Sequence, residues 1–573
     1  MGITEEKVVG LNELKYVDTP ARYTGGEARQ VIKNKYQVTS RVALAVPTMY
    51  ELGFSNEDLK KLYYTLNLRR DCLAERVFAP MTDFEALIRN KEEKLYTLES
   101  KTALRDMDVI LFMIPNVLMY TNILNMLNMG GVPCLRERRK EGFPLVIATG
   151  EAVLNPKPMD DFVDLYIIGE PNKVINEVMD AYKRAKESFN VTKREILESM
   201  KYIPGVYIPD VTEPNQIVEM VYEHVSEEQY IKNYVVPSIP VALNKSLITL
   251  TKGCNRDCLS CPKRYLYNTM QNVSVEKAAI KAQKMMDATG NLDIMLESNC
   301  HADYTGYPDV IYKLKDIEKP KVKTITFKDI KIDKDNLWIL KYLDIDGNYP
   351  TIMVGAPTEK LRNKIGVWIN EYDVLDVARE IFKAGFDKVR LEYILGIPGE
   401  NYEDFKVMLE TANKVCDVYR EVYAKSPDKY IVEIKLTNFT VKPHTPSVWC
   451  AVNNSENIEI KTKYILEKNK NQDVVINNED GKQTEIATML SRGGRELGQV
   501  IYEAWKQGAK FDMLSNVFDK ENWQVGLTKN GIELKKYLEE QNDKLCFPWD
   551  NIRVGTSREE LRRIYLNRIK HME

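Results

Sequence analysis

The chain has 573 residues, of which 44% are hydrophobic and 29% are charged, and its formal net charge is −3. This length predicts about three domains, and the composition is that of a soluble globular protein. The small negative charge provides no global basic field for nucleic acid. The sequence shows neither an apolar run long enough to span a membrane nor the pattern of a secretory signal, so we expect a cytoplasmic protein without membrane contacts.

The first region of the chain alternates short apolar segments with helical ones. We expect strands at residues 41–47, 74–80, 108–115, 144–150 and 163–170, with helices such as 56–68 and 120–129 between them. Near-continuous apolar strands separated by helices predict a doubly wound parallel sheet, which binds ligands at the carboxyl ends of its strands. We assign residues 1–195 to this Rossmann-like α/β domain and residues 196–243 to a connector.

A second alternating region follows the connector. Strands are expected at residues 245–251, 292–298, 323–327, 350–355, 388–396 and 430–440, with helices such as 372–384 and 402–419. Six βα units are fewer than the eight of a complete barrel, so we predict an open, partial (β/α)6 barrel over residues 244–452. Residues 453–573 are predicted to form a mostly helical extension, in which the Lys- and Asn-rich residues 456–482 form a solvated face.

Three cysteines cluster directly after the first strand of this second region. The segment TLTKGCNRDCLSCPKRY contains Cys254, Cys258 and Cys261, and the other six of the nine cysteines are scattered, which indicates reduced thiols rather than a disulfide framework. A zinc site takes four ligands and would need Cys300 or His301 in addition. Iron–sulfur clusters are held by thiolates, normally four, so three would leave one iron of a 4Fe–4S cluster open to another ligand. Three unligated cysteines are the remaining alternative.

The CxxxCxxC loop, placed after the first strand of a partial barrel, resembles the radical S-adenosylmethionine (SAM) superfamily. The resemblance implies that the open iron chelates the amino and carboxylate groups of SAM, and that one electron cleaves SAM to methionine and a 5′-deoxyadenosyl radical. The segment YILGIPGENYEDF at residues 393–405 resembles a late element of that superfamily, in which Gly396, Gly399 and Glu400 lie at the adenine. Glu400 could equally cap the following helix. Ser260 stands where relatives commonly have an aromatic residue.

The N-terminal half resembles a cobalamin-binding domain, and the whole chain resembles a subfamily of uncharacterised cobalamin-binding radical SAM proteins. The matching stretches are RYTGGE, LAERVFAP, YTNILNML, VKPHTP and PWDNIRVG. The Asp-x-His-x-x-Gly motif is missing, so the resemblance implies cobalamin bound without a protein histidine beneath the cobalt. A domain that has lost its cofactor is the alternative. We expect Tyr50, Gly53 and Ser55 to face the corrin. Thr149, Gly150 and Asn155 are expected to contact the nucleotide tail, and Gly169 and Glu170 lie at the next strand end.

Candidate catalytic residues follow the second barrel strand. Cys300 and His301 lie at its expected carboxyl end, the active-site face of such barrels, and His301 is a candidate general base or substrate ligand. A buried histidine with only hydrogen-bonding partners is the alternative. Gly355 occupies a position where relatives often have a SAM-contacting Glu, and His444 either shapes the substrate mouth or is structural.

The resemblance implies a cobalamin-dependent radical SAM methyltransferase. One SAM would methylate cobalamin, a second would give the radical, and the methyl group would pass to an unactivated carbon of the substrate. The alternatives are a cobalamin-dependent rearrangement or cyclisation and a non-catalytic iron–sulfur or cobalamin sensor. Methylthio transfer is disfavoured because such enzymes carry a second three-cysteine cluster in the N-terminal domain, where this chain has Cys72 and Cys134. We expect a reductant such as flavodoxin or ferredoxin as partner, and the substrate class (small molecule, peptide or RNA) stays open.

Overall fold

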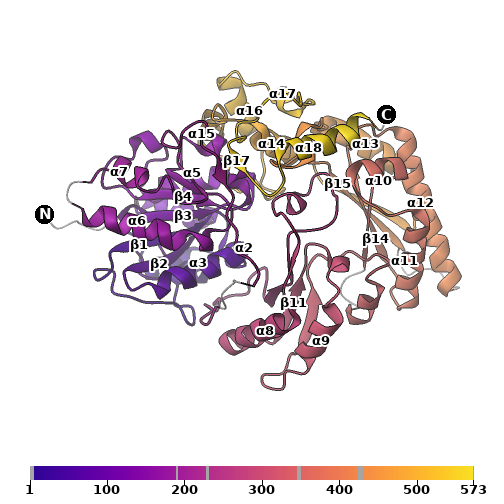
Figure 1. Ribbon diagram of the computed structural model, residues 1–573, viewed down its shortest axis with the longest axis horizontal. Coiled ribbons are helices and arrows are strands. Elements are labelled where there is room, and N and C mark those ends of the chain that lie inside the picture. Colours follow the sequence, from indigo (N-terminus) through magenta and orange to yellow (C-terminus); the bar gives the residue numbers. More distant parts are fainter. Residues whose placement is uncertain (1–5, 189–190, 227–230, 345–349, 424–429, 572–573) are drawn as a thin grey trace.

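The chain folds into two α/β halves that are bridged by its C-terminal residues. The computed structural model describes residues 6–188, 191–226, 231–344, 350–423 and 430–571. Figure 1 shows the N-terminal domain on one side, the barrel region on the other, and the C-terminal helices lying across both.

The N-terminal domain is built on a six-stranded sheet in the order β2-β1-β3-β4-β5-β6, in which the first five strands are parallel and β6 is antiparallel to β5. The strands are β1 (Ser40–Val46), β2 (Cys72–Phe78), β3 (Val109–Met113), β4 (Leu145–Thr149), β5 (Leu165–Ile167) and β6 (Val206–Tyr207). The five predicted strands are therefore confirmed. The strand β6 lies in the predicted connector, so the sheet extends beyond residue 195.

Helices cover both faces of this sheet, as the apolar strands predicted. Helices α3 (Glu57–Leu68) and α6 (Ile175–Glu187) pack on one face, and α4 (Thr82–Asn90) and α5 (Tyr120–Met129) pack on the other. Asn56 starts α3, because its side chain accepts a hydrogen bond from the backbone of Leu59 at 3.1 Å. The strand order reverses between β1 and β3, which is where flavodoxin-like sheets bind flat ligands.

The second half contains two parallel ladders, β12-β11-β8 and β13-β14-β15-β16. The strands are β8 (Ser246–Thr249), β11 (Asp293–Glu297), β12 (Thr324–Phe327), β13 (Thr351–Gly355), β14 (Val389–Leu395), β15 (Val432–Asn438) and β16 (Val474–Asn478). All six predicted strands are present, but they form two ladders instead of one continuous sheet, and β16 is an additional seventh strand.

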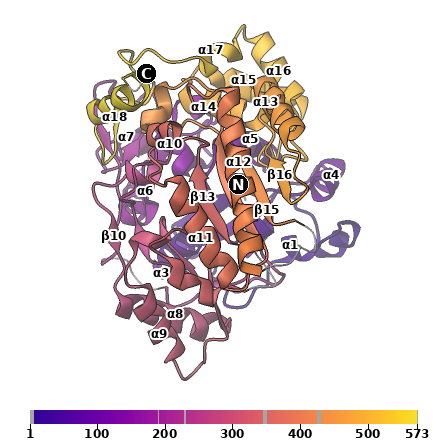
Figure 2. The ribbon, with the colours of Figure 1, turned by 90° about the vertical axis from the view of Figure 1, so that its right-hand side faces the viewer.

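The strand β16 corrects the prediction that residues 456–482 form only a solvated face of a helical extension. Its Val-Val-Ile start is β-branched and pairs with β15, whereas its last two residues, Asn477 and Asn478, are exposed. An edge strand with a polar end gives only a short apolar signal. The outer surface of the ladders is covered by α8 (Val275–Thr289), α9 (Tyr307–Lys315), α11 (Glu371–Lys383), α12 (Tyr402–Tyr423) and α13 (Ser455–Lys468), as Figure 2 shows.

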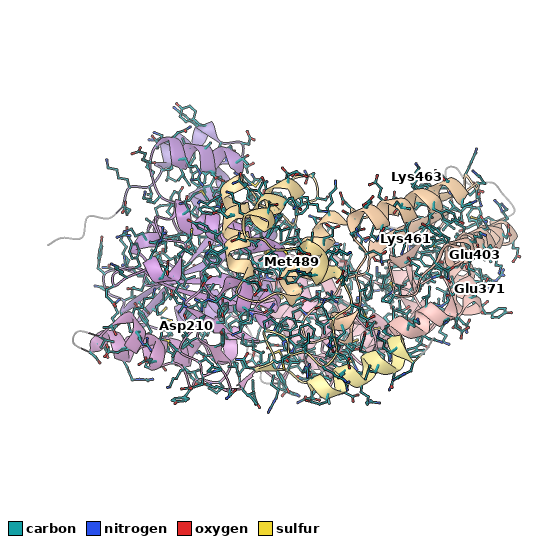
Figure 3. All side chains as sticks on the ribbon, turned by 90° about the horizontal axis from the view of Figure 1, so that it is seen from above. Asp210, Glu371, Glu403, Lys461, Lys463 and Met489 are labelled. Atoms are coloured by element: carbon teal, nitrogen blue, oxygen red, sulfur yellow. The ribbon has the colours of Figure 1, made fainter. Side chains whose placement is uncertain are left out.

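The C-terminal region packs between the two halves. It contains α14 (Lys482–Arg492), α15 (Leu497–Gln507), α16 (Lys520–Lys529), α17 (Leu534–Leu538), β17 (Ile552–Arg553) and α18 (Arg558–Tyr565), and β17 pairs with β7 (Val218–Glu219) of the connector. Met489 of α14 is fully buried between the halves (Figure 3). One apolar core joins residues of the N-terminal sheet, the barrel and this region. Among the residues described, none of the helices is both long and apolar enough to cross a membrane.

Candidate functional site

The three clustered cysteines lie on one closed loop. Residues 253–270, called the cysteine loop below, run between β9 (Thr251–Lys252) and β10 (Gln271–Asn272), which pair antiparallel and close the loop at its base. The Asn299 side chain donates a hydrogen bond to the Gly253 carbonyl at 2.7 Å. The loop therefore follows the carboxyl end of β8 and is tied to the segment after β11, on the face where βα barrels carry their active sites.

The thiols of the loop are gathered and partly withdrawn from water. Cys254 is buried, and Cys258 and Cys261 are half-buried. Burial raises the pKa of Cys258 to about 12, and repulsion by the neighbouring thiolates acts in the same direction. Burial also raises the pKa of Cys254. The backbone N–H of Arg256 lies 3.4 Å from the Cys254 sulfur and donates to it. Binding to iron would replace the thiol protons and remove this repulsion.

The donor set fits a cluster better than a single metal ion. In the described ranges, no three His, Cys, Asp or Glu side chains converge tightly enough to hold one metal ion. A tetrahedral zinc site needs such convergence, whereas each thiolate of an iron–sulfur cluster binds a different iron and the sulfurs lie further apart. Three soft thiolates on one partly buried loop are therefore suited to an iron–sulfur cluster.

The cysteine loop rests on the end of α10 (Glu359–Ile365). The Leu259 N–H donates to the Ile365 carbonyl at 2.9 Å, and Gly366 follows with a left-handed φ of 73°. A Cβ at Gly366 would lie 2.0 Å from the Asp257 carbonyl oxygen, so only glycine permits this approach. Arg568 holds the same carbonyl from the C-terminal side, with Nη1 at 2.6 Å.

The glycine-rich turn after β14 lies beside α10. Gly396 and Gly399 have left-handed φ values of 90° and 84°, a backbone conformation that favours glycine. The Glu400 carboxylate accepts from the Gly396 N–H at 3.0 Å and from Lys461 Nζ at 2.9 Å, and its side chain is fully buried. Figure 3 marks Lys461 on the barrel side. These bonds stabilise the turn and differ from the helix cap that the sequence offered as an alternative, because Asn401 is the residue that accepts from the Glu403 N–H at the start of α12.

Sequence reasoning missed Lys364, which lies between this turn and the cysteine loop. Lys364 is 6% exposed. Its Nζ lies 3.1 Å from the position that a Cβ would take at Gly399. Within the described part of the chain, the Lys364 ammonium has no hydrogen-bond or ion-pair partner. This cation lies beside the glycine-rich turn, where an anionic ligand would pair with it.

Cys300 and His301 follow β11, as predicted, but they differ in their surroundings. Burial raises the pKa of the Cys300 thiol to about 11. His301 Nε2 donates to the Lys328 carbonyl at 2.8 Å, so Nδ1 is the acceptor for the Tyr307 hydroxyl at 2.5 Å. Burial lowers the pKa of His301. Both ring nitrogens are occupied, which favours the hydrogen-bonded structural alternative over a general base or substrate ligand.

Two parts of the chain match known protein families. Residues 58–209 match the family described as radical SAM proteins, N-terminal, and residues 248–412 match the radical SAM superfamily. The chain belongs to the radical SAM superfamily. The second match contains the cysteine loop, Lys364 and the glycine-rich turn, so the site described above falls within the part of a radical SAM protein that defines the superfamily.

Related proteins cover different shares of the chain. An uncharacterised protein of Methanocaldococcus jannaschii is 23% identical over 477 residues, which are 81% of this chain and 91% of the relative. A tRNA-2-methylthio-N(6)-dimethylallyladenosine synthase of Rickettsia akari is 22% identical over 49% of this chain and 63% of its own length. Among solved structures, the radical SAM methyltransferase TsrM of Kitasatospora setae has 13% identity and a TM-score of 0.43, covering 70% of this chain and 75% of its own. The cobalamin-dependent SAM radical enzyme OxsB has 12% identity and a TM-score of 0.45, covering 95% and 83%.

Three residues in the N-terminal domain of this radical SAM protein were predicted to face a corrin. In the structure, each of them contacts other parts of the chain. The Tyr50 hydroxyl donates to Glu27 at 3.2 Å, and Glu27 is paired with the fully buried Arg76 at 2.9 Å. A Cβ at Gly53 would lie 2.5 Å from the Phe78 ring, so this glycine permits helix packing. Ser55 Oγ donates to the Glu51 carbonyl and accepts from Leu243, both at 3.0 Å. These contacts hold the three residues within the protein, and their contact with a corrin stays a prediction.

The residues predicted to contact the nucleotide tail are also engaged within the radical SAM protein. Thr149 Oγ1 donates to the Ile167 carbonyl at 3.1 Å, and Asn155 Nδ2 donates to the Leu490 and Gly493 carbonyls at 3.2 and 2.9 Å. Gly150 and Gly169 have left-handed φ values of 114° and 104°. Asn155 thus links the C-terminal region to the N-terminal domain, and the contact of these residues with a cofactor stays a prediction.

His444 lies at the same junction of the radical SAM protein. Its Nε2 donates to the Leu154 carbonyl at 3.1 Å, and burial lowers its pKa to about 4. It lines a cavity of about 200 Å³ together with Trp449, Phe547 and Trp549. The hydrogen bond joins the VKPHTP segment to the loop after β4, which gives His444 a structural role at the domain junction.

Proposed function

We propose that this protein is a cobalamin-dependent radical SAM methyltransferase, which transfers a methyl group from SAM to an unactivated carbon of its substrate. The observation that carries the proposal is the site formed by three loop thiols, the glycine-rich turn and the Lys364 ammonium beside that turn. When bound, the reduced cluster supplies the electron that cleaves SAM, and cobalamin carries the methyl group. A reductant such as flavodoxin or ferredoxin is proposed as the electron donor.

Each part of the SAM site has a defined task in this proposal. Cys254, Cys258 and Cys261 hold the cluster and leave one iron open to SAM. Lys364 would offer its ammonium to the SAM carboxylate, which pairs the two charges. The left-handed turn at Gly396 and Gly399 presents backbone to the adenine without side chains in the way.

The cobalamin part of the proposal is supported by the N-terminal sheet. Its β2-β1-β3-β4-β5 order is the flavodoxin-like one, and the loops after β4 and β5 are in contact with the C-terminal region, the connector and the cysteine-loop segment. The side chains expected to touch cobalamin are bonded within the protein, so no chemical step is assigned to them. Cys72 and Cys134 are both buried, Cys134 donates to the Leu124 carbonyl, and a second three-cysteine cluster for methylthio transfer is not encoded in this domain.

Product analysis tests the reaction class. Anaerobically reconstituted protein with cobalamin, reductant and SAM is expected to form both S-adenosylhomocysteine and 5′-deoxyadenosine. Formation of 5′-deoxyadenosine alone would instead indicate a rearrangement or cyclisation. Formation of neither product would contradict an enzymatic role and favour a sensor.

Ligand binding tests the role proposed for Lys364 without reference to activity. Lys364→Met is expected to weaken SAM binding by about tenfold to a hundredfold, the loss typical of a charge-assisted hydrogen bond. Binding of 5′-methylthioadenosine, which lacks the amino-acid part of SAM, should be unchanged. Lys360→Met on the exposed side of α10 is the matched control. Equal weakening of both ligands would show that Lys364 does not recognise the carboxylate.

A further inference from the structure

A single carboxylate of the N-terminal domain contacts both ends of the cysteine loop. Glu170 follows β5 at the carboxyl edge of the sheet. Its Oε2 accepts from Lys252 Nζ at 2.9 Å, and its Oε1 accepts from the Tyr267 hydroxyl at 3.1 Å. Lys252 immediately precedes the loop, and Tyr267 lies three residues after η8 (Pro262–Arg264), near the loop's end. The two bonds therefore bracket the stretch that contains all three cysteines.

Glu170 is itself held in place by the connector. Its N–H donates to the Val221 carbonyl at 2.8 Å, and its Oε2 also accepts from the Glu223 N–H at 3.0 Å. A Cβ at the preceding Gly169 would lie 2.0 Å from the Val221 oxygen, so glycine permits this close approach. The Lys252 ammonium makes a further bond to the Glu223 carbonyl at 2.7 Å. The connector therefore holds both Glu170 and Lys252 in place.

The environment makes these bonds stronger than ordinary surface contacts. The side chains of Glu170 and Lys252 are only 22% and 14% exposed. Burial, together with the Glu170 charge, raises the pKa of Tyr267, so its hydroxyl keeps the proton that it donates. Two charge-assisted hydrogen bonds from opposite ends of one loop restrain it more than either bond alone, because each reduces the freedom left to the other end.

We propose that Glu170 is a positioning residue for the cluster, which fixes both ends of the cysteine loop to the N-terminal domain. The inference rests on the proposed function, because it assumes that the loop binds an iron–sulfur cluster. It reassigns Glu170 from a cofactor contact to a link between two domains. The geometry of the three thiols then depends on the docking of the N-terminal domain, and a radical SAM barrel separated from that domain would hold its cluster less tightly.

Hydrogen–deuterium exchange on the full-length protein tests the positioning directly, before and after iron–sulfur reconstitution. Glu170→Gln keeps the size of the side chain but loses the charge that pairs with Lys252. Peptides from residues 253–270 are expected to exchange about tenfold faster in this variant than in the wild type. Tyr267→Phe, which removes one of the two bonds, should show a smaller increase. Unchanged exchange in Glu170→Gln would overturn the inference.

Iron loss to a chelator under anaerobic conditions provides the second readout. Reconstituted Glu170→Gln is expected to lose iron about tenfold faster than the wild type, with a far-ultraviolet circular dichroism spectrum that stays the same. Glu85→Gln is the matched control, because Glu85 also links the N-terminal domain to another region, through Lys510 at 3.0 Å. Equal iron loss in Glu170→Gln and wild type overturns this inference alone. A wild-type protein that binds no iron overturns the proposed function instead.

Discussion

Arg568 is expected to hold the cysteine loop from the C-terminal side, and its removal gives the clearest quantitative prediction. Its Nη1 donates to the Asp257 carbonyl at 2.6 Å, its Nη2 lies 3.4 Å from the Asp257 carboxylate, and its guanidinium lies 5.7 Å from the Trp368 ring centre. The charge-assisted hydrogen bond contributes about 1.5–3 kcal/mol. The ion pair adds at most about 1 kcal/mol, since the Asp257 side chain is 46% exposed. The exposed Trp368 contact adds about 0.5 kcal/mol.

These contributions sum to about 3 kcal/mol, so Arg568→Ala should raise the population of the detached loop roughly a hundredfold. Iron release to a chelator from the reconstituted protein measures this population. Arg562→Ala is the control, because Arg562 lies on neighbouring α18 and pairs with Asp543 at 2.6 Å. Iron release from Arg568→Ala that is no faster than from the Arg562→Ala control would refute the reasoning.

The remaining predictions concern packing, pH and catalysis. In urea unfolding, Gly366→Ala should lower the free energy of unfolding by more than Gly290→Ala. Both glycines have a left-handed φ, but only at Gly366 would the added Cβ meet another atom, the Asp257 oxygen at 2.0 Å. Equal losses of unfolding free energy would contradict this packing. Burial lowers the pKa of His444 from 6.5 to about 4, so the unfolded chain takes up this proton first as the pH falls. The stability that neutral His444 contributes is complete above about pH 6.5 and is lost toward pH 4. Between pH 7.5 and pH 5, the free energy of unfolding in urea should therefore fall by about 2 kcal/mol more in the wild type than in His444→Gln. Parallel pH curves for the two proteins would contradict this. His301→Gln should lower the thermal midpoint while SAM cleavage continues, and loss of cleavage in a folded variant would restore a catalytic role.

The sequence predicted the elements of the fold well, because buried parallel strands leave long apolar runs. All eleven strands expected from such runs are present, and α3 and α5 begin and end within a residue of their expected positions. The strand β16 escaped prediction because three apolar residues inside a Lys- and Asn-rich segment resemble a solvated turn. The separation into two ladders has no signal in residue spacing.

The candidate site was predictable where chemistry is tied to residue type. Three thiols at fixed spacing indicated the cluster loop, and paired glycines indicated the turn after β14. Tyr50, Asn155 and Glu170 were assigned to cofactors because they follow strand ends, yet such positions also form contacts within the protein. Tyr50 bonds within its own domain, whereas Asn155 and Glu170 bond to other regions of the chain. Lys364 had no distinguishing feature in the sequence, since its position beside Gly399 is a property of the folded chain alone.

Electron paramagnetic resonance of the reduced, reconstituted protein tests the central claim most directly. The three-cysteine loop should hold a 4Fe–4S cluster whose signal changes when SAM is added, because SAM binds the iron that has no protein ligand. A triple Cys→Ala variant of Cys254, Cys258 and Cys261 should show no such signal. A cluster signal that SAM leaves unchanged, or a wild-type protein that binds no iron, would contradict the account.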